Sequence, residues 1–158
     1  GVVTGYGLID GNLVYVYCQN PEVLHGTIGE MHAKKIANVY DMAMKMGAPV
    51  IGLIDCAGMC LQEATDALYG FGNLYLKQTM ASGVIPQITA VFGTCGGGMA
   101  IIPALTDFTF IESKKGKMFV NSPNALDGNY TEKCDTSAAA FQSEETGLVD
   151  GTGSEEEK

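Results

Sequence analysis

Short, mostly apolar runs alternate along this chain with segments whose apolar residues recur at helical spacing. The runs at residues 50–54 and 88–92 are typical of strands that are covered on both faces. The helical pattern covers residues 27–46 and 62–82. This alternation predicts an α/β fold with a largely parallel sheet, in which ligands bind beyond the C-terminal ends of the strands. The first helix is expected to bury Ile28, Met31, Ile36, Val39, Tyr40, Ala43 and Met46.

The N-terminal residues predict a β-hairpin. Residues 2–9 and 12–18 are rich in β-branched and aromatic side chains and flank Asp10-Gly11, a dipeptide typical of a two-residue turn. Further elements are expected as short strands at residues 108–111 and 118–120, a short helix at 99–105 and a last helix at 138–146.

Length and composition predict one domain with a sizeable core. The chain has 158 residues, of which 46% are hydrophobic, too many for a disordered protein. We assign residues 1–150 to this domain and the acidic residues 151–158 to a tail or a truncated linker. No apolar run is long enough to span a membrane and no secretion signal is present, so a cytoplasmic protein is expected.

The charge pattern limits the possible ligands. The net charge is −9, which argues against nucleic acid as a partner. Every basic residue is lysine, so the chain lacks the planar clamp by which arginine holds carboxylates and phosphates. Any bound anion must be held by lysine or by backbone N–H groups.

A glycine-dense turn at residues 93–98 follows the apolar run at 88–92. It contains Gly96, Gly97 and Gly98 immediately before a short helical segment. Glycines let backbone N–H groups approach a ligand, and the first N–H groups of a helix are unpaired and carry partial positive charge. The turn could therefore hold an oxyanion. The alternative is that small residues only let the helix pack closely on the sheet.

The cysteines and histidines show no metal-binding pattern. Five dispersed cysteines are present: Cys18, Cys56, Cys60, Cys95 and Cys134. They lack the paired short spacings of a zinc site and indicate free thiols in a reducing compartment. The positions of Cys56, Cys60 and Cys95 near candidate loops leave a catalytic thiol as an alternative. His25 and His32 also lack metal-ligand spacing, so we expect no metal.

Five segments follow one another in an order that belongs to a known family. They are residues 3–7 (VTGYG), 29–35 (GEMHAKK), 47–52 (GAPVIG), 81–88 (ASGVIPQI) and 103–108 (PALTDF). Together they resemble the N-terminal half of the carboxyltransferase subunits of biotin-dependent acyl-CoA carboxylases and decarboxylases. The resemblance implies a crotonase-like (ClpP/crotonase) superhelix of ββα units that binds acyl-CoA.

The resemblance also implies a cofactor and partners. Biotin would arrive on a biotin carboxyl carrier protein, and a carboxyltransferase C-terminal half or partner subunit would receive it. The complete enzyme would be a homo-oligomer, and a place in a membrane decarboxylase complex is compatible with this chain. Five lysines could meet the phosphates of CoA, although a solvated face explains each of them singly: Lys34, Lys35, Lys114, Lys115 and Lys117.

In that family, a glycine pair similar to Gly97 and Gly98 stabilises the thioester enolate through backbone N–H groups, which makes these two the implied catalytic residues. Gly96 and the loop after residue 54 would bind the substrate. The loop residues are Cys56, Ala57, Gly58, Met59 and Cys60. The family usually has Ser-Gly-Gly-Ala-Arg here, so Cys60 replaces a cation. This departure would change the acyl group that is accepted, or weaken binding.

Three other interpretations stay open. An enoyl-CoA hydratase of the same fold would need carboxylates near the oxyanion hole, whereas Glu30, His32, Glu63 and Asp66 are simplest as helix caps or solvated side chains. A non-catalytic scaffold subunit would keep the fold and lose CoA affinity. A related serine protease would need a histidine after the glycine turn, and none follows it.

Overall fold

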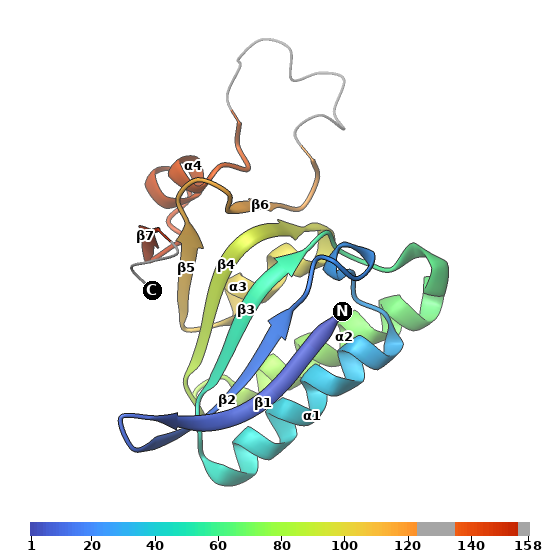
Figure 1. The fold of residues 1–158 in the computed structure, drawn as a ribbon, viewed down its shortest axis with the longest axis vertical. Coiled ribbons are helices and arrows are strands. Elements are labelled where there is room, and N and C mark those ends of the chain that lie inside the picture. Colours follow the sequence, from blue (N-terminus) through green and yellow to red (C-terminus); the bar gives the residue numbers. More distant parts are fainter. Residues whose placement is uncertain (123–134, 155–158) are drawn as a thin grey trace.

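The computed structural model describes residues 1–122 and 135–154, which form a sheet whose long helices pack on one face (Figure 1). Within these residues the strands are β1 (Val2–Ile9), β2 (Asn12–Gln19), β3 (Val50–Cys56), β4 (Gln87–Gly96), β5 (Phe108–Glu112), β6 (Lys117–Phe119) and β7 (Gly151–Gly153). The α-helices are α1 (Glu30–Met46), α2 (Ala64–Ala81), α3 (Ile101–Leu105) and α4 (Ala139–Glu144). Short 3-10 helices are η1 (Leu24–Gly26), η2 (Leu61–Glu63) and η3 (Gly97–Ala100).

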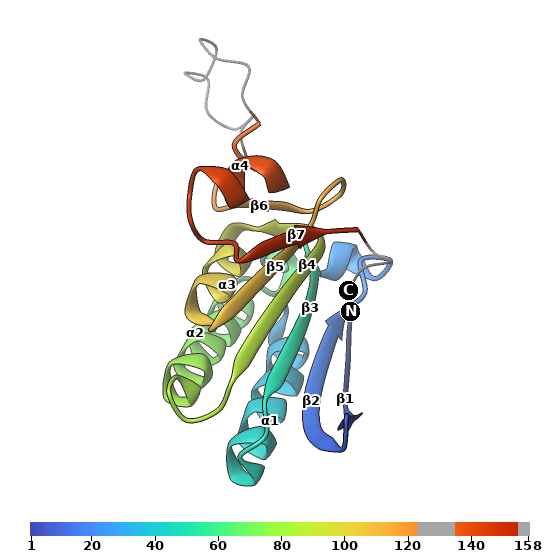
Figure 2. The same ribbon diagram turned by 90° about the vertical axis from the view of Figure 1, so that its left-hand side faces the viewer.

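The sheet is mixed, with the order β1-β2-β3-β4-β5-β7. The predicted hairpin is confirmed: β1 and β2 pair antiparallel, and Asp10 and Gly11 in the turn have φ of 49° and 80°. β2 to β5 and β7 pair in parallel, as the alternation of strands and helices predicts. β6 also pairs with β4, at its C-terminal end. The crossover helices α1 and α2 cover the same face of the sheet (Figure 2).

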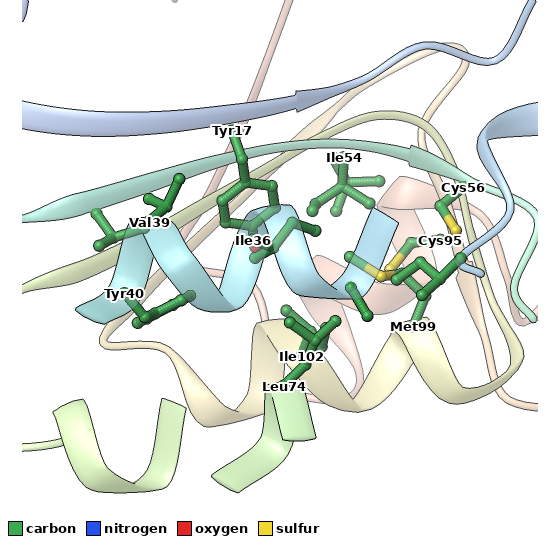
Figure 3. Packing of buried hydrophobic residues seen from close by; sticks show 14 of the residues in the cluster. Tyr17, Ile36, Val39, Tyr40, Ile54, Cys56, Leu74, Cys95, Met99 and Ile102 are labelled. Atoms are coloured by element: carbon green, nitrogen blue, oxygen red, sulfur yellow. The ribbon is translucent and has the colours of Figure 1, made fainter. Parts of the chain in front are cut away.

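The core lies between the sheet and α1 and α2, where Tyr17, Ile36, Ile54 and Leu74 are each at most 1% exposed (Figure 3). Most residues predicted for the buried face of the first helix are indeed buried. Met31 and Met46 are not, with exposed fractions of 65% and 62%. Met31 lies five residues before Ile36, which places it away from the inner face at 3.6 residues per turn. Met46 is the last residue of α1.

Two strands are longer than predicted. β3 does not end before Asp55 but continues through Cys56, and β4 continues through Gly96. The β3–β4 register is irregular here, because Ile54 pairs with Val91 and Cys56 with Cys95. In this irregularity an oxygen of the Asp55 carboxylate accepts the Thr94 N–H at 3.0 Å. The extra pairing extends the ladder, so the glycine turn begins at Gly97 rather than at residue 93.

Residues 151–153, expected to open an acidic tail, form β7 instead. They pair in parallel with β5, and Ser113 donates its N–H to the Gly153 carbonyl at 3.0 Å. The Asp150 N–H is likewise bound by the Thr109 carbonyl at 2.8 Å. Edge pairing with an existing strand therefore outweighs the polar composition of this segment. Residues 155–158 lie outside the described part of the chain.

Candidate functional site

The two loops singled out from the sequence lie side by side at the C-terminal ends of adjacent parallel strands. Cys56 at the end of β3 pairs with Cys95 near the end of β4, so residues 57–60 and 97–100 leave the sheet next to each other. An added Cβ on Gly97 would lie 4.0 Å from Gly58 Cα. The structure thus brings the predicted loop and the predicted glycine turn together.

The close approach requires glycine at three positions. Gly58 and Gly97 have φ of 121° and 61°, which L side chains rarely adopt. A Cβ on Gly58 would lie 3.1 Å from the Gly96 carbonyl oxygen, and one on Gly96 would lie 3.0 Å from the Ala57 carbonyl oxygen. Both distances are shorter than ordinary van der Waals contact. The glycines therefore let two backbone segments touch.

A helical segment begins directly at this contact. η3 starts at Gly97 and continues into α3, and the first N–H groups of a helix have no acceptor within it. Gly97 and Gly98 are half-buried, whereas Gly96 and Met99 are buried on either side of them. Because glycine has no side chain, the exposed part of these two predicted catalytic residues is backbone. Chemically, such N–H groups suit an oxygen that carries or develops negative charge.

The loop at residues 57–60 is tied to the segment before α1. Ala57 donates its N–H to the His25 carbonyl at 3.0 Å, and Cys60 donates to the Ile28 carbonyl at 2.9 Å. Ile28 in turn donates to the Gly58 carbonyl at 2.9 Å. These backbone bonds fix the loop against residues 25–28. Ala57 is exposed and Met59 half-buried, so both can meet a ligand.

The thiols in this region have structural roles. Cys56 is fully buried, and its sulfur lies 3.4 Å from both the N–H nitrogen and the carbonyl oxygen of Gly58. Burial raises the pKa of Cys56 to about 11 and raises that of Cys95 well above its usual value. Both thiols, which lie near Met99 in Figure 3, are therefore protonated at neutral pH. Cys60 Sγ lies 3.3 Å from Gln62 Oε1, and Cys134 is outside the described residues. The geometry does not favour a thiolate nucleophile.

A buried polar cluster lies beneath the glycine turn. The Gln19 amide nitrogen lies 3.3 Å from His32 Nε2 and 3.7 Å from Met99 Sδ. Burial lowers the pKa of His32 to about 4, so the imidazole is neutral at physiological pH. His32 is 8% exposed, and the Gln19 amide links it to Met99, the residue that follows Gly98.

The candidate carboxylates and lysines are mostly engaged elsewhere. The Glu63 carboxylate accepts the Glu30 N–H at 2.5 Å and so caps α1, as the helix-cap interpretation predicts. The remaining pairs are Lys34 with Glu30 at 2.6 Å, Lys117 with Asp135 at 3.0 Å, and Lys35 Nζ with the Val2 carbonyl at 2.7 Å. Within residues 1–122 and 135–154, no group of three His, Cys, Asp or Glu side chains could hold a metal ion. In the same residues, no helix is long and apolar enough to cross a membrane.

Sequence reasoning missed two aromatic residues at the turn. Tyr75 donates its hydroxyl to the Gly98 carbonyl at 2.6 Å. Phe119 from β6 packs against Gly96, where a Cβ would lie 3.1 Å from its ring. The helical spacing of Tyr75 after Phe71 places both on one face of α2, but nothing local indicates which carbonyl the hydroxyl reaches.

The fold and this turn define a known class of protein. Residues 1–158 match the model of the carboxyl transferase domain family, and the chain belongs to that family. It is 51% identical over 126 residues to the methylmalonyl-CoA decarboxylase subunit alpha of Veillonella parvula, covering 80% of this chain and 25% of the relative. The propionyl-CoA carboxylase beta chain of Roseobacter denitrificans is 48% identical over 126 residues, with coverage of 80% and 25%. The chain spans about a quarter of the length of these relatives.

Solved structures confirm the crotonase-like fold class. Transcarboxylase 12S, a hexamer crystallised with hydrolysed methylmalonyl-CoA, superposes with a TM-score of 0.92 at 31% identity. The match covers 98% of this chain and 30% of that one. The MdcD–MdcE hetero-dimer of Pseudomonas malonate decarboxylase gives a TM-score of 0.87 at 21% identity, over 98% of this chain and 70% of that one. This second likeness shows the fold alone.

Proposed function

We propose that this chain is the acyl-CoA-binding part of a biotin-dependent carboxyltransferase or decarboxylase. The enzyme would move a carboxyl group between biotin and an acyl-CoA through an enolate held by the N–H groups of Gly97 and Gly98. The observation that carries the proposal is the contact between the Gly58 loop and the Gly97 turn at the start of η3. Family membership supports the reaction class.

The chemistry needs few side chains. Removing a proton beside a thioester, or adding a carboxyl group there, places negative charge on the carbonyl oxygen. Donors that are already oriented in a partly dry site stabilise that charge, and loss of one such donor costs about 3–4 kcal/mol in other enzymes. The neutral His32 and the protonated Cys56 agree with a site that works through backbone dipoles.

Substrate contacts would come from Ala57 and Met59, whereas the buried Cys56, Gly58, Cys60 and Gly96 would shape the loop and the turn around them. The loop offers one exposed alanine and the half-buried Met59, and it contains no charged side chain. Cys60 is 3% exposed and its thiol faces Gln62, so this position brings no positive charge to the loop. We infer that this loop recognises the acyl group by apolar contact and shape.

The complete activity requires partners. Residues 1–150 would form the acyl-CoA-binding domain, and biotin would be delivered by a carrier protein to a C-terminal half or partner subunit. Relatives of this chain act on methylmalonyl-CoA or propionyl-CoA, as their names state. The hexamer of transcarboxylase 12S supports a homo-oligomer.

The test is a calorimetric titration of the purified chain with CoA and with short acyl-CoAs. Gly97→Val should lower acyl-CoA affinity at least about tenfold, because a β-branched side chain in the left-handed region distorts the turn. Gly7→Val is the matched control, because a Cβ at Gly7 has no atom within 4 Å. Loss of binding in both variants, or in neither, would contradict the proposal.

The same preparation separates the alternatives. Absence of any CoA binding by the unaltered chain would favour a scaffold subunit. Hydration of an enoyl-CoA by the purified chain would favour a hydratase.

A further inference from the structure

Tyr75 contacts the backbone of the glycine turn through its hydroxyl. It lies on α2, and its hydroxyl donates to the Gly98 carbonyl at 2.6 Å. The Tyr75 ring packs against Phe71, with ring centroids 5.9 Å apart and planes tilted by 40°. Phe71 is itself 3% exposed. Packing of the rings therefore directs the hydroxyl at this carbonyl.

The turn and the tyrosine fit each other closely. A Cβ on Gly98 would lie 2.9 Å from the Tyr75 hydroxyl and 3.4 Å from the Phe71 ring. The absence of a side chain at residue 98 is thus what lets the hydroxyl reach the backbone. Any larger residue at 98 would push the phenol away.

Two consecutive glycines make the backbone flexible, which is unfavourable for a site that depends on the direction of its N–H donors. Glycine has more accessible backbone conformations than other residues, so Gly97 and Gly98 lose the most entropy when the turn is ordered. The Gly98 carbonyl, which also accepts the Ile101 N–H, shares a peptide with the Met99 N–H, so rotation about Gly98 would change the angle between this peptide and the one that carries the Gly98 N–H. Oriented donors stabilise charge only when they are held in place before the reaction.

We propose that Tyr75 is a positioning residue that holds the Gly98 carbonyl and thereby keeps the N–H groups of the turn aimed at the enolate oxygen. This inference rests on the proposed function. Partial burial raises the pKa of Tyr75, so the phenol remains a donor at neutral pH. Its bond to the carbonyl also polarises the adjoining peptides.

The test compares a neutral ligand with a charged one. Propionyl-CoA represents the ground state, and a CoA analogue with a nitronate group in place of the thioester carbonyl copies the charge of the enolate. Tyr75→Phe keeps the ring and removes only the hydroxyl. Tyr69→Phe is the matched control, because Tyr69 lies on the same helix and is 75% exposed.

Tyr75→Phe should weaken nitronate binding about fivefold and change propionyl-CoA binding less than twofold, as expected for loss of one hydrogen bond that orients donors. Tyr69→Phe should change neither. Equal weakening of both ligands would show a purely structural role, and no change in either would also overturn the inference. If the unaltered chain binds neither ligand, the proposed function itself has failed.

A second readout does not depend on a ligand. In protein labelled with ¹⁵N-glycine, Tyr75→Phe should lower the NMR order parameters of Gly97 and Gly98 and leave those of Gly5 and Gly7 unchanged. Unchanged order parameters at Gly97 and Gly98 would contradict the positioning role even if ligand affinity changed.

Discussion

Glycines occur in two regions of this molecule for different physical reasons. At the ends of β3 and β4, Gly58 and Gly97 adopt positive φ, and a Cβ on Gly58 or Gly96 would lie within 3.1 Å of a backbone oxygen. In the hairpin, a Cβ on Gly5 or Gly7 would have no atom within 4 Å. The glycines at the strand ends allow two backbone segments to touch, whereas the folded hairpin has room for a side chain at Gly5 and Gly7.

The difference shows how glycine content should be weighed. A glycine indicates a site only where the backbone needs its conformation or its lack of a side chain. Both requirements meet again at Gly26 in η1, which has φ of 67° and whose Cβ would overlap the Asp55 carbonyl oxygen. Gly26 therefore contributes to the geometry of the site, because its lack of a side chain lets η1 lie against the end of β3.

The largest effect is expected at Gly26. Gly26→Ala should lower the free energy of unfolding by about 3 kcal/mol, because it combines a left-handed backbone with overlap against backbone. The Tm should fall by roughly 6–12 °C. Thermal unfolding followed by circular dichroism measures this.

Gly11→Ala is the matched control for Gly26→Ala. Gly11 in the hairpin turn has φ of 80° but no atom within 4 Å of an added Cβ. Gly11→Ala should lower the free energy of unfolding by only about 1 kcal/mol, which is the cost of placing a Cβ in the left-handed region. Equal losses in the two variants would show that the contact with Asp55 contributes nothing.

An intermediate effect is expected from pH. The pKa of His32 is lowered to about 4 by burial, against about 6.5 in an unfolded chain. The unfolded state therefore takes up the proton first as pH falls, and the contribution of neutral His32 is lost between pH 6.5 and 4. Between pH 7 and pH 5 the loss should be about 2 kcal/mol. Denaturant unfolding at pH 7, 6 and 5 measures it.

Two variants test whether His32 causes this pH dependence of stability. His32→Gln should remove most of the loss between pH 7 and pH 5, whereas His25→Gln, at an exposed position, should retain it. A slope that survives in His32→Gln would mean that another group is responsible. The cluster beneath the glycine turn would then not be the acid-sensitive part of the fold.

The smallest effect is expected in the hairpin and has the opposite sign. Gly5→Ala should stabilise the protein by about 0.5 kcal/mol, because alanine restricts the unfolded chain and meets no atom in the folded one. The Tm should rise by roughly 1–2 °C. A clear destabilisation would remove the distinction between the two groups of glycines.

Periodicity predicts most of the fold because the patterns are local. The hairpin, α1, α2 and the parallel strands follow from apolar spacing and from the turn residues Asp10, Gly11 and Gly47. The extensions of β3 and β4 and the formation of β7 depend on partners far along the chain. A pattern confined to one segment cannot specify that Lys117 pairs with Thr94 or that Gly151 pairs with Phe110.

The site divides in the same way. Its backbone part could be predicted, because strand ends and glycines place Gly58 and Gly97 at one edge of the sheet. Its side-chain supports could not, because Tyr75 and Gln19 reach the turn from other elements, and His32 contacts Gln19. In the sequence, these residues look like ordinary core positions, so their contacts near the turn cannot be predicted from it.

The most direct test of the account is an NMR titration of ¹⁵N-glycine-labelled protein with propionyl-CoA. We predict that the amide signals of Gly97 and Gly98 shift with the same saturation curve, and that those of Gly5 and Gly7 do not move. Saturable binding that leaves Gly97 and Gly98 unshifted would contradict the central claim, because the acyl-CoA would then occupy another surface.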